Sequence, residues 1–403
     1  MSKLEELIQE LCPNGVEYRK LGEVSDFITG FAFKSSLFLT EGLPICRTTN
    51  IQGNEISFEN MEYFNPGYYI ENLDKYIIYP QKIVIGMSGT IKVGINNSKN
   101  ICYLNQRVGM FTPMNSILNK YLYYVLCNSI ETLITGLNGG SVKNLSNDDI
   151  KGLIIPIPPI EVQYEIVRIL DNFTELTAEL TAELTARKKQ YEYYRDELIS
   201  NASYPRVKLS QIATTMFRGN GIKRDEVTAE GVPCIRYGEI YTSYGVHFSQ
   251  CISHTKKDLI ANPKTLKKND VLFAITGENI EDIAKTTAYV GDEDGYVGGD
   301  IVVLRHNQNA KYLSYALSTK DAVNQKGKGK VKSKVVHSSV PAISNIVIPL
   351  PSLKEQQTIV DILDKFAAYC NDFSIGLPAE IAARQKQYEY YRDKLLTFKE
   401  LQG

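Results

Sequence analysis

The sequence predicts an α+β fold in which two mixed α/β domains are joined by two long antiparallel helices that form a coiled coil. The first observation behind this prediction is a repeat: the heptapeptide Gln190–Asp196 occurs again, letter for letter, as Gln387–Asp393 in a chain of 403 residues. The second is a proline-rich helix entry in each half, Ile155–Pro159 and Ile348–Pro351. Proline is favoured in the first helical turn and excluded from later turns. Together these repeats indicate a tandem duplication with a pseudo-two-fold axis.

The repeats divide the chain into four segments. We expect a first domain at 1–155, a first long helix at 156–203, a second domain at 204–348 and a second long helix at 349–403. In the first domain, short apolar runs at 82–87 and 108–111 predict buried strands, and 118–126 has helical spacing. Gly42–Arg47 aligns with Gly231–Arg236, so the second domain repeats the same scaffold.

The first long helix is predicted from an uninterrupted periodic stretch. Residues 160–199 contain no proline or glycine, and apolar residues recur there at steps of three or four, with one longer step after Arg187. Such a helix is about 60 Å long, which is too long to stand alone, so we expect the second copy to pair with it. Gly376 and Pro378 are expected to interrupt that second helix.

A four-residue unit is repeated inside the first helix, as Thr177-Ala-Glu-Leu180 and Thr181-Ala-Glu-Leu184. Four residues add about 6 Å and about 40° of rotation beyond a full turn. A leucine stripe with a solvated glutamate face explains the residue types but not an identical tandem repeat. We therefore interpret this unit as a length adjuster.

Composition excludes several classes of protein. No apolar run is long enough to cross a bilayer, no signal peptide is evident, and seven scattered cysteines suit a reducing cytoplasm. The chain has no phosphate-binding glycine loop, no base-methyltransferase tetrad and no Glu-x-Lys triplet of the common nucleases. All four histidines lie in the second copy. These absences predict a chain without a catalytic or metal site.

Positive charge is concentrated in the second domain. Residues 204–348 carry 20 Lys and Arg against 14 Asp and Glu, a net charge of +6, whereas residues 17–155 carry 12 of each. Alternating lysines in the second domain would lie on one side of an extended segment and could follow a phosphate backbone. These lysines are Lys326, Lys328, Lys330, Lys332 and Lys334.

Two aligned pairs of cations provide further candidates for DNA contacts. Lys34 aligns with Lys223, and Arg47 aligns with Arg236, so each pair occupies the same position in the two domains. Lysine and arginine contact phosphates, and arginine also reads guanine edges. Lys92 and Lys143 are additional candidates in the first domain.

These features resemble the DNA-specificity subunit of type I restriction–modification systems. The resemblance rests on Leu11–Tyr18, the two Ile-Pro-x-Pro entries, Gln163 and Gln356 in the first helical turns, and both heptapeptides. The Thr-Ala-Glu-Leu units and Gly376–Ile381 resemble the type IC branch in particular. The resemblance covers the whole chain.

The resemblance implies two target recognition domains, each reading one half of a bipartite, asymmetric DNA target, and helices that set the spacer. It implies two methyltransferase (modification) subunits docked on the helices, and two restriction subunits in the full complex. S-adenosylmethionine, ATP and Mg²⁺ would belong to those partners. On the heptapeptides, Tyr193, Arg195, Tyr390 and Arg392 fall outside the packing stripe and are the expected docking residues. A protein-binding coiled-coil adaptor and an enzyme of another type remain the alternatives.

Overall fold

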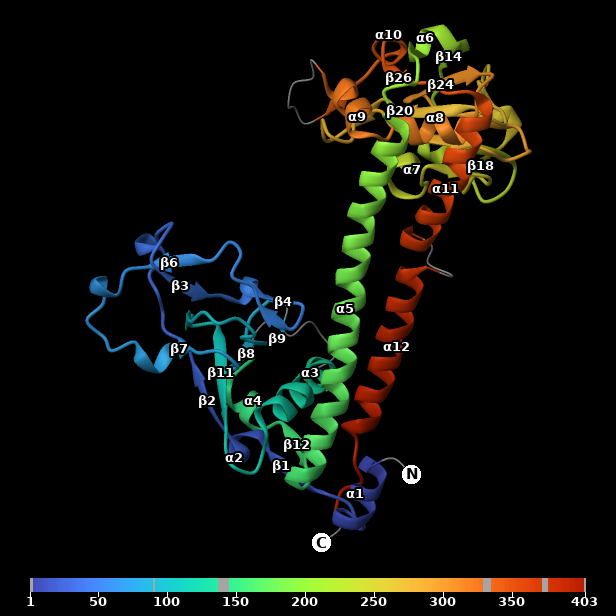
Figure 1. Ribbon diagram of the computed structural model, residues 1–403. Coiled ribbons are helices and arrows are strands. Elements are labelled where there is room, and N and C mark those ends of the chain that lie inside the picture. The colour runs from blue at the N-terminus through green and yellow to red at the C-terminus, as the bar shows by residue number, and fades with distance from the viewer. Residues whose placement is uncertain (1–2, 90, 137–144, 329–334, 372–375, 402–403) are drawn as a thin grey trace. The chain divides into compact units, whose positions relative to one another are not determined.

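The computed structural model describes residues 3–89, 91–136, 145–328, 335–371 and 376–401 (Figure 1). The chain divides into two compact units: unit 1 comprises Met1–Glu179 and Ile381–Gly403, and unit 2 comprises Leu180–Glu380. The boundary between them crosses the longest helix, α5 (Ile160–Ile199), so each unit contains one half of it. No helix in the described part of the chain is long and apolar enough to cross a membrane.

Unit 1 is a mixed α/β domain with parts of two long helices. Its sheets have the strand orders β2-β11-β8-β9-β5-β4 and β6-β3-β10-β7, and β1 pairs with β12. Its elements are α1 (Lys3–Leu11), β1 (Glu17–Lys20), α2 (Leu21–Val24), β2 (Ser25–Thr29), the 3₁₀ helix η1 (Ser35–Leu37), β3 (Leu43–Cys46), η2 (Thr48–Asn50), β4 (Ile51–Gln52), β5 (Glu55–Ile56), β6 (Glu62–Phe64), η3 (Pro66–Tyr68), η4 (Asp74–Tyr76), β7 (Ile77–Ile78), β8 (Ile83–Gly86), β9 (Val93–Ile95), β10 (Cys102–Leu104), β11 (Val108–Pro113), α3 (Asn119–Gly136), α4 (Asn147–Lys151), β12 (Ile154–Ile157), the first half of α5 and most of α12 (Leu377–Leu395).

Unit 2 repeats this plan. Its sheets have the orders β14-β24-β20-β22-β17 and β15-β18-β16-β23-β19, with the pairs β13-β26 and β21-β25. Its elements are the second half of α5, β13 (Arg206–Lys208), α6 (Leu209–Ile212), β14 (Ala213–Arg218), η5 (Arg224–Glu226), β15 (Val227–Thr228), β16 (Val232–Ile235), α7 (Tyr237–Thr242), β17 (His247–Phe248), β18 (Ser253–Thr255), η6 (Lys257–Leu259), β19 (Thr265–Leu266), β20 (Val271–Ala274), β21 (Thr276–Gly277), β22 (Lys285–Tyr289), β23 (Gly295–Val297), β24 (Ile301–His306), α8 (Ala310–Ala316), α9 (Lys320–Gly327), β25 (Val336–His337), α10 (Val340–Ser344), β26 (Val347–Pro349) and α11 (Leu353–Asn371).

The strands β3 and β16 show how closely the two copies correspond. Each follows a glycine with a φ of +133°, Gly42 in unit 1 and Gly231 in unit 2. A Cβ atom would lie 2.7 Å from the backbone oxygen of Phe64 at the first position, and 2.5 Å from that of Thr255 at the second. Both the positive φ and the close approach therefore require glycine. The predicted alignment of Gly42–Arg47 with Gly231–Arg236 is confirmed in the backbone.

In each unit two antiparallel helical segments contact one another through aromatic rings (Figure 1). In unit 1 the rings of Phe173 on α5 and Tyr391 on α12 stack at 5.5 Å, and in unit 2 Tyr194 on α5 meets Phe366 on α11 at 5.9 Å. As predicted near Gly376, the second helical region is two helices, α11 and α12. The predicted long antiparallel helices are therefore confirmed.

An aspartate on the first long helix ties the domain of unit 1 to that helix. Asp171 accepts hydrogen bonds from the Lys120 ammonium and the Tyr124 hydroxyl, both at 2.7 Å. One turn from the start of α5, the buried Gln163 accepts from the Leu118 amide at 2.8 Å and donates to the Ser116 carbonyl at 3.0 Å. These bonds fix the first turn of α3 against α5.

Unit 2 repeats this anchor and adds a histidine. Asp364 on α11 accepts from the Lys311 ammonium and the Tyr315 hydroxyl, both at 2.7 Å, and His247 Nε2 lies 3.4 Å from the same carboxylate. Burial alone would raise the pKa of Asp364, but hydrogen bonds from His247, Lys311 and Tyr315 outweigh it and hold the pKa well below its usual value. The buried Gln356 repeats the role of its counterpart by accepting from the Asn309 amide at 3.0 Å.

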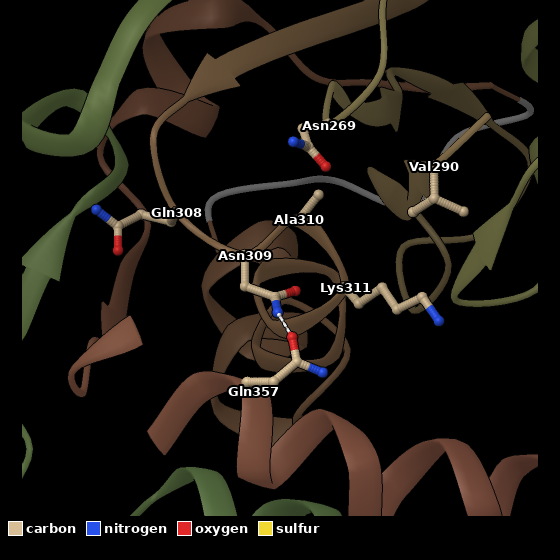
Figure 2. Close-up of a pocket in the computed structure, with 7 residues that line it drawn as sticks. All are labelled: Asn269, Val290, Gln308, Asn309, Ala310, Lys311 and Gln357. Carbon is tan, nitrogen blue, oxygen red and sulfur yellow. Dashed lines mark hydrogen bonds between the residues drawn. The ribbon is translucent and has the colours of Figure 1, made fainter. Parts of the chain in front are cut away.

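A polar hollow of about 300 Å³ lies beside this anchor in unit 2 (Figure 2). The Asn309 side-chain amide donates to the side-chain oxygen Oε1 of Gln357 on α11 at 2.9 Å. The Lys311 side chain points away from that pair (Figure 2). The hollow is thus part of the joint between the domain and its helix. Its lining residues are Asn269, Val290, Gln308, Asn309, Ala310, Lys311 and Gln357.

The two ends of the chain meet in unit 1. The Val16 amide donates to the Lys399 carbonyl at 2.9 Å, and the Leu401 amide donates to the Val16 carbonyl at 2.9 Å. The Tyr18 hydroxyl donates to the Phe398 carbonyl at 2.9 Å. Leu396 is buried in the same core as residues of α1, α3 and α5. Unit 1 is therefore built from both the beginning and the end of the chain.

Candidate nucleic-acid interface

In unit 1 the loop that leads to Lys34 and the loop that carries Arg47 are both hydrogen-bonded to a third segment, residues 104–108. After β2, the Gly30 amide donates to the Val108 carbonyl and the Phe31 amide to the Leu104 carbonyl, at 3.0 and 2.9 Å. The next residue of that segment, Asn105, donates its amide to the Cys46 carbonyl at 3.2 Å, immediately before Arg47. One segment therefore bridges the loop that leads to Lys34 and the loop that carries Arg47.

Unit 2 makes the same three connections with different residues. The amides of Gly219 and Asn220 donate to the carbonyls of Ile301 and Val297, at 2.9 and 3.1 Å. The Gly298 amide donates to the Ile235 carbonyl at 2.8 Å, immediately before Arg236. The site is thus a repeated three-segment junction. The residues that follow the first connection differ, because Phe31 and Phe33 pack into an aromatic cluster in unit 1 whereas a Gly-Asn-Gly stretch occupies this place in unit 2.

Within the described residues, the candidate lysines outside the alternating run are exposed on the surface. Lys34 and Lys92 are exposed, and Lys34 precedes η1 just as Lys223 precedes η5. The Lys223 side chain is 77% exposed, and its ammonium lies 3.9 Å from Glu226. An ion pair at that distance and exposure contributes little stability, so the charge of Lys223 is available to a partner.

The arginines at the junction are held differently, because each meets a carboxylate. Arg47 Nη1 donates to Glu62 at 3.3 Å, and Arg236 Nε donates to Glu239 at 3.0 Å. Both guanidinium groups remain partly exposed. The structure therefore places the two predicted pairs at equivalent positions, where each arginine is bonded to a carboxylate and each lysine is exposed. Sequence reasoning missed both carboxylates: Glu62 comes from the neighbouring strand β6, and Glu239 has no acidic counterpart at position 50 of unit 1 that would have drawn attention to it.

The prediction that five alternating lysines share one side of an extended segment is wrong for its first member. Residues 320–327 form α9, which Thr319 caps by accepting from the Ala322 amide. Lys326 is buried in that helix, and its ammonium donates to the Thr286 hydroxyl at 2.7 Å. Burial lowers the pKa of Lys326 to about 7. Of the others, Lys328 is exposed, whereas Lys330, Lys332, Lys334 and also Lys143 lie outside the described residues.

The expected docking residues of the heptapeptides divide into exposed rings and folded-back arginines. Tyr193 and Tyr390 are 60% and 63% exposed, as expected. Arg195 is only 9% exposed, which contradicts its expected place on the surface. Its guanidinium donates to Asp196 at 2.7 Å and covers the ring of Tyr191, and Arg392, which is half-buried, donates to Asp393 at 2.8 Å. Each arginine is bonded to the aspartate that follows it, so Tyr193 and Tyr390 are the more exposed members of this set.

The chain was compared with known proteins. A model of the type I restriction modification DNA specificity domain matches residues 13–187 and 204–383. A putative type I restriction enzyme specificity subunit from Haemophilus influenzae is 28% identical over 400 residues, which cover 95% of this chain and 96% of the relative. A type I restriction enzyme specificity subunit from Escherichia coli is 33% identical over 295 residues, which cover 70% of this chain and 72% of the relative.

Solved structures share the fold. The S subunit of a type I restriction–modification system from M. genitalium superposes with a TM-score of 0.51 at 16% identity, covering 95% of this chain and 96% of that one. A chain from a structure on complex assembly and conformational transition of the type I R-M system gives a TM-score of 0.64 at 15% identity, covering 95% and 98%. At such identities the likeness concerns the fold, which agrees with the predicted pair of α/β domains and their helices.

Proposed function

Since the chain belongs to the type I restriction–modification DNA specificity family, we propose that it is the non-catalytic subunit that reads DNA for such an enzyme. Each target recognition domain reads one half of a bipartite, asymmetric target. The observation that carries this proposal is the three-segment junction, whose backbone bonds recur in both units while the residues around it differ. A duplicated frame with diverged loops suits two related readers of two different sequences.

The chain works within a restriction–modification complex in the cytoplasm. We propose that two methyltransferase (modification) subunits dock on the long helices and that restriction subunits join the full complex. S-adenosylmethionine is then held by the modification subunits, and ATP and Mg²⁺ by the restriction subunits. This assignment is supported by the absence from the sequence of the motifs that such chemistry uses.

The test is to express the chain with its cognate modification subunit and to map the methylated adenines in the host genome. We expect one bipartite sequence with two defined half-sites and a spacer of fixed length. A single continuous target, or methylation that does not change when the chain is omitted, would refute the proposal. Duplex binding that is equal on all sequences would instead favour the adaptor alternative.

Docking of the modification subunits is expected to depend on the two exposed tyrosines of the heptapeptides. Tyr193→Ala and Tyr390→Ala should each weaken assembly by about 2 kcal/mol, roughly 30-fold in Kd, because exposed tyrosines are common interface hot spots. The measurement is titration of the modification subunit by sedimentation or light scattering. Glu192→Ala, at a neighbouring exposed position, is the matched control and should leave assembly unchanged. Unchanged assembly in both tyrosine variants would place the docking surface elsewhere.

A further inference from the structure

The carboxylates that meet the two equivalent arginines occupy different positions in the two units. The register of the strands makes this comparison possible. In unit 1, Ile45 of β3 lies opposite Glu62 of β6, and in unit 2 the equivalent Cys234 of β16 lies opposite Ser253 of β18. Glu62 therefore corresponds to Ser253. The residues three places after the arginines, Asn50 and Glu239, also correspond.

In unit 1 the residue three places after the arginine is neutral. The amide of Arg47 donates to the Oδ1 atom of Asn50 at 3.0 Å, and Asn50 is buried. The acid comes from the facing strand, where Glu62 accepts from Arg47 Nη1 at 3.3 Å. The Arg47 guanidinium also lies 6.0 Å from the centre of the Phe38 ring.

In unit 2 the acid lies at the position that corresponds to Asn50, and a serine lies at the position that corresponds to Glu62. The residue three places after Arg236 is Glu239, whose Oε2 accepts from the Arg236 amide at 3.0 Å, as Asn50 does in unit 1. Its Oε1 accepts from Arg236 Nε at 3.0 Å and from the Ser253 hydroxyl at 2.6 Å. Glu239 and Ser253 are both buried, whereas about a third of the Arg236 side chain is exposed.

Each arginine has thus kept one carboxylate although the acid has moved. A half-exposed ion pair contributes little to stability, and burying the Glu239 carboxylate costs free energy unless it is well paired. Glu239 also caps the start of α7, but in unit 1 Asn50 rather than Glu62 accepts from the arginine amide, so capping does not explain an acid at both arginines. Orientation does, because a carboxylate bonded to one edge of the planar guanidinium fixes the direction of its other N–H groups.

On the premise of the proposed function, we propose that Arg47 and Arg236 each read a guanine in one half-site, and that Glu62 and Glu239 are their positioning residues. Paired with an acid, each arginine adds little net charge and is a poor phosphate anchor. Its remaining donors keep a fixed direction, which suits bidentate contact with guanine O6 and N7. Lys223, which is 77% exposed and meets its nearest carboxylate, Glu226, only at 3.9 Å, contacts phosphate.

The first test measures base preference with the chain assembled with its modification subunits. Binding is measured to duplexes in which each base pair of the target is changed in turn. Arg236→Ala should remove roughly five- to 150-fold of discrimination at one G·C pair of one half-site. Arg47→Ala should do the same in the other half-site only. In each variant, the half-site that is not affected reports that the assembled chain still binds DNA.

Lys223→Ala is the matched control for a phosphate contact. It should weaken binding to all duplexes alike and reduce the slope of log K against log salt by about 0.9. If Arg236→Ala behaves like Lys223→Ala, with a uniform loss and a smaller salt slope, the arginine contacts phosphate and the proposal is overturned. Retained discrimination at every base pair would also overturn it.

The second test moves the acid of unit 2 to the place that it has in unit 1. Glu239→Asn alone should reduce discrimination at the same base pair as Arg236→Ala. Adding Ser253→Glu should restore it, because the double variant reproduces the Asn50 and Glu62 arrangement. A double variant that discriminates no better than Glu239→Asn would overturn the positioning role. If the unsubstituted complex shows no bipartite target, the proposed function has failed, and this outcome is distinct from a failure of the arginine assignment.

Discussion

One additional Thr-Ala-Glu-Leu unit after Leu184 is expected to lengthen the recognised spacer by one or two base pairs and to leave both half-sites unchanged. The insertion adds about 6 Å to α5, whereas one base-pair step is about 3.4 Å. The insertion point lies near a part of α5 that is not anchored in the described buried core of either unit. In α5, Leu170 belongs to the buried core of unit 1 and Leu184 packs on that of unit 2, whereas Leu176 and Leu180 belong to neither of these two described cores.

The part of α5 that contains the Thr-Ala-Glu-Leu units is regular helix, so an insertion there preserves the backbone hydrogen bonds of the helix. The hydroxyls of Thr177 and Thr185 bond to carbonyls four residues earlier within α5 itself. The added rotation of about 40° can be absorbed in part by local unwinding of the helix pair. Methylation maps of the parent and the insertion variant decide the question. A matched control, Thr177→Ser with Thr181→Ser, keeps the length and should keep the spacer. A changed half-site would show that α5 does more than set the distance, and an unchanged spacer would show that α5 does not set it.

Replacing the aspartate anchor of unit 2 is expected to destabilise that unit more than the equivalent change destabilises unit 1. Asp364→Asn weakens charge-assisted bonds to Lys311 and Tyr315 and removes the attraction to His247, so we expect a loss of about 3 kcal/mol. Asp171→Asn affects only the first two kinds of contact and should cost about 2 kcal/mol. Urea unfolding followed by circular dichroism, with hydrogen exchange to assign each transition to its unit, measures both.

The pH dependence of the same anchor has a defined sign. The pKa of Asp364 is lower in the folded chain than its usual value of about 3.9, so its carboxylate binds fewer protons when folded. The stability it contributes is therefore fully present above about pH 4 and is lost as the pH falls through the folded-state pKa. Asp364→Asn should remove this part of the acid sensitivity. His247→Ala should bring the effect of Asp364→Asn close to that of Asp171→Asn, and an unchanged difference would exclude the histidine as its cause.

Local patterns predicted much of this fold. The heptapeptides, the proline entries and the uninterrupted stretch at 160–199 indicated the duplication, the helix starts and α5, because these features depend on neighbouring residues. The alignment ending at Arg47 and Arg236 also placed the two arginines correctly, since a glycine with positive φ fixes the strand that precedes each of them.

The rest depended on contacts between residues far apart in the chain. The alternation predicts an extended segment that includes Lys326, but Thr319 caps a helix that contains this residue, and its buried ammonium donates to the Thr286 hydroxyl. The exchange of acids between the two units becomes visible only when the register of β3 with β6 and of β16 with β18 is known. Residue spacing contains neither fact.

The meeting of the two chain ends in unit 1 fixes an order of events during synthesis. The residues of unit 2 are continuous, so this unit has all its parts once Glu380 has left the ribosome. Unit 1 needs residues made after unit 2: Leu396 and Phe398 pack on its core, and Phe398 and Leu401 hydrogen-bond Tyr18 and Val16. Although domains generally fold in the order in which they are made, here the unit whose synthesis starts first is completed by residues that follow unit 2 in the chain. Until then the apolar surface that Leu396 covers stays exposed.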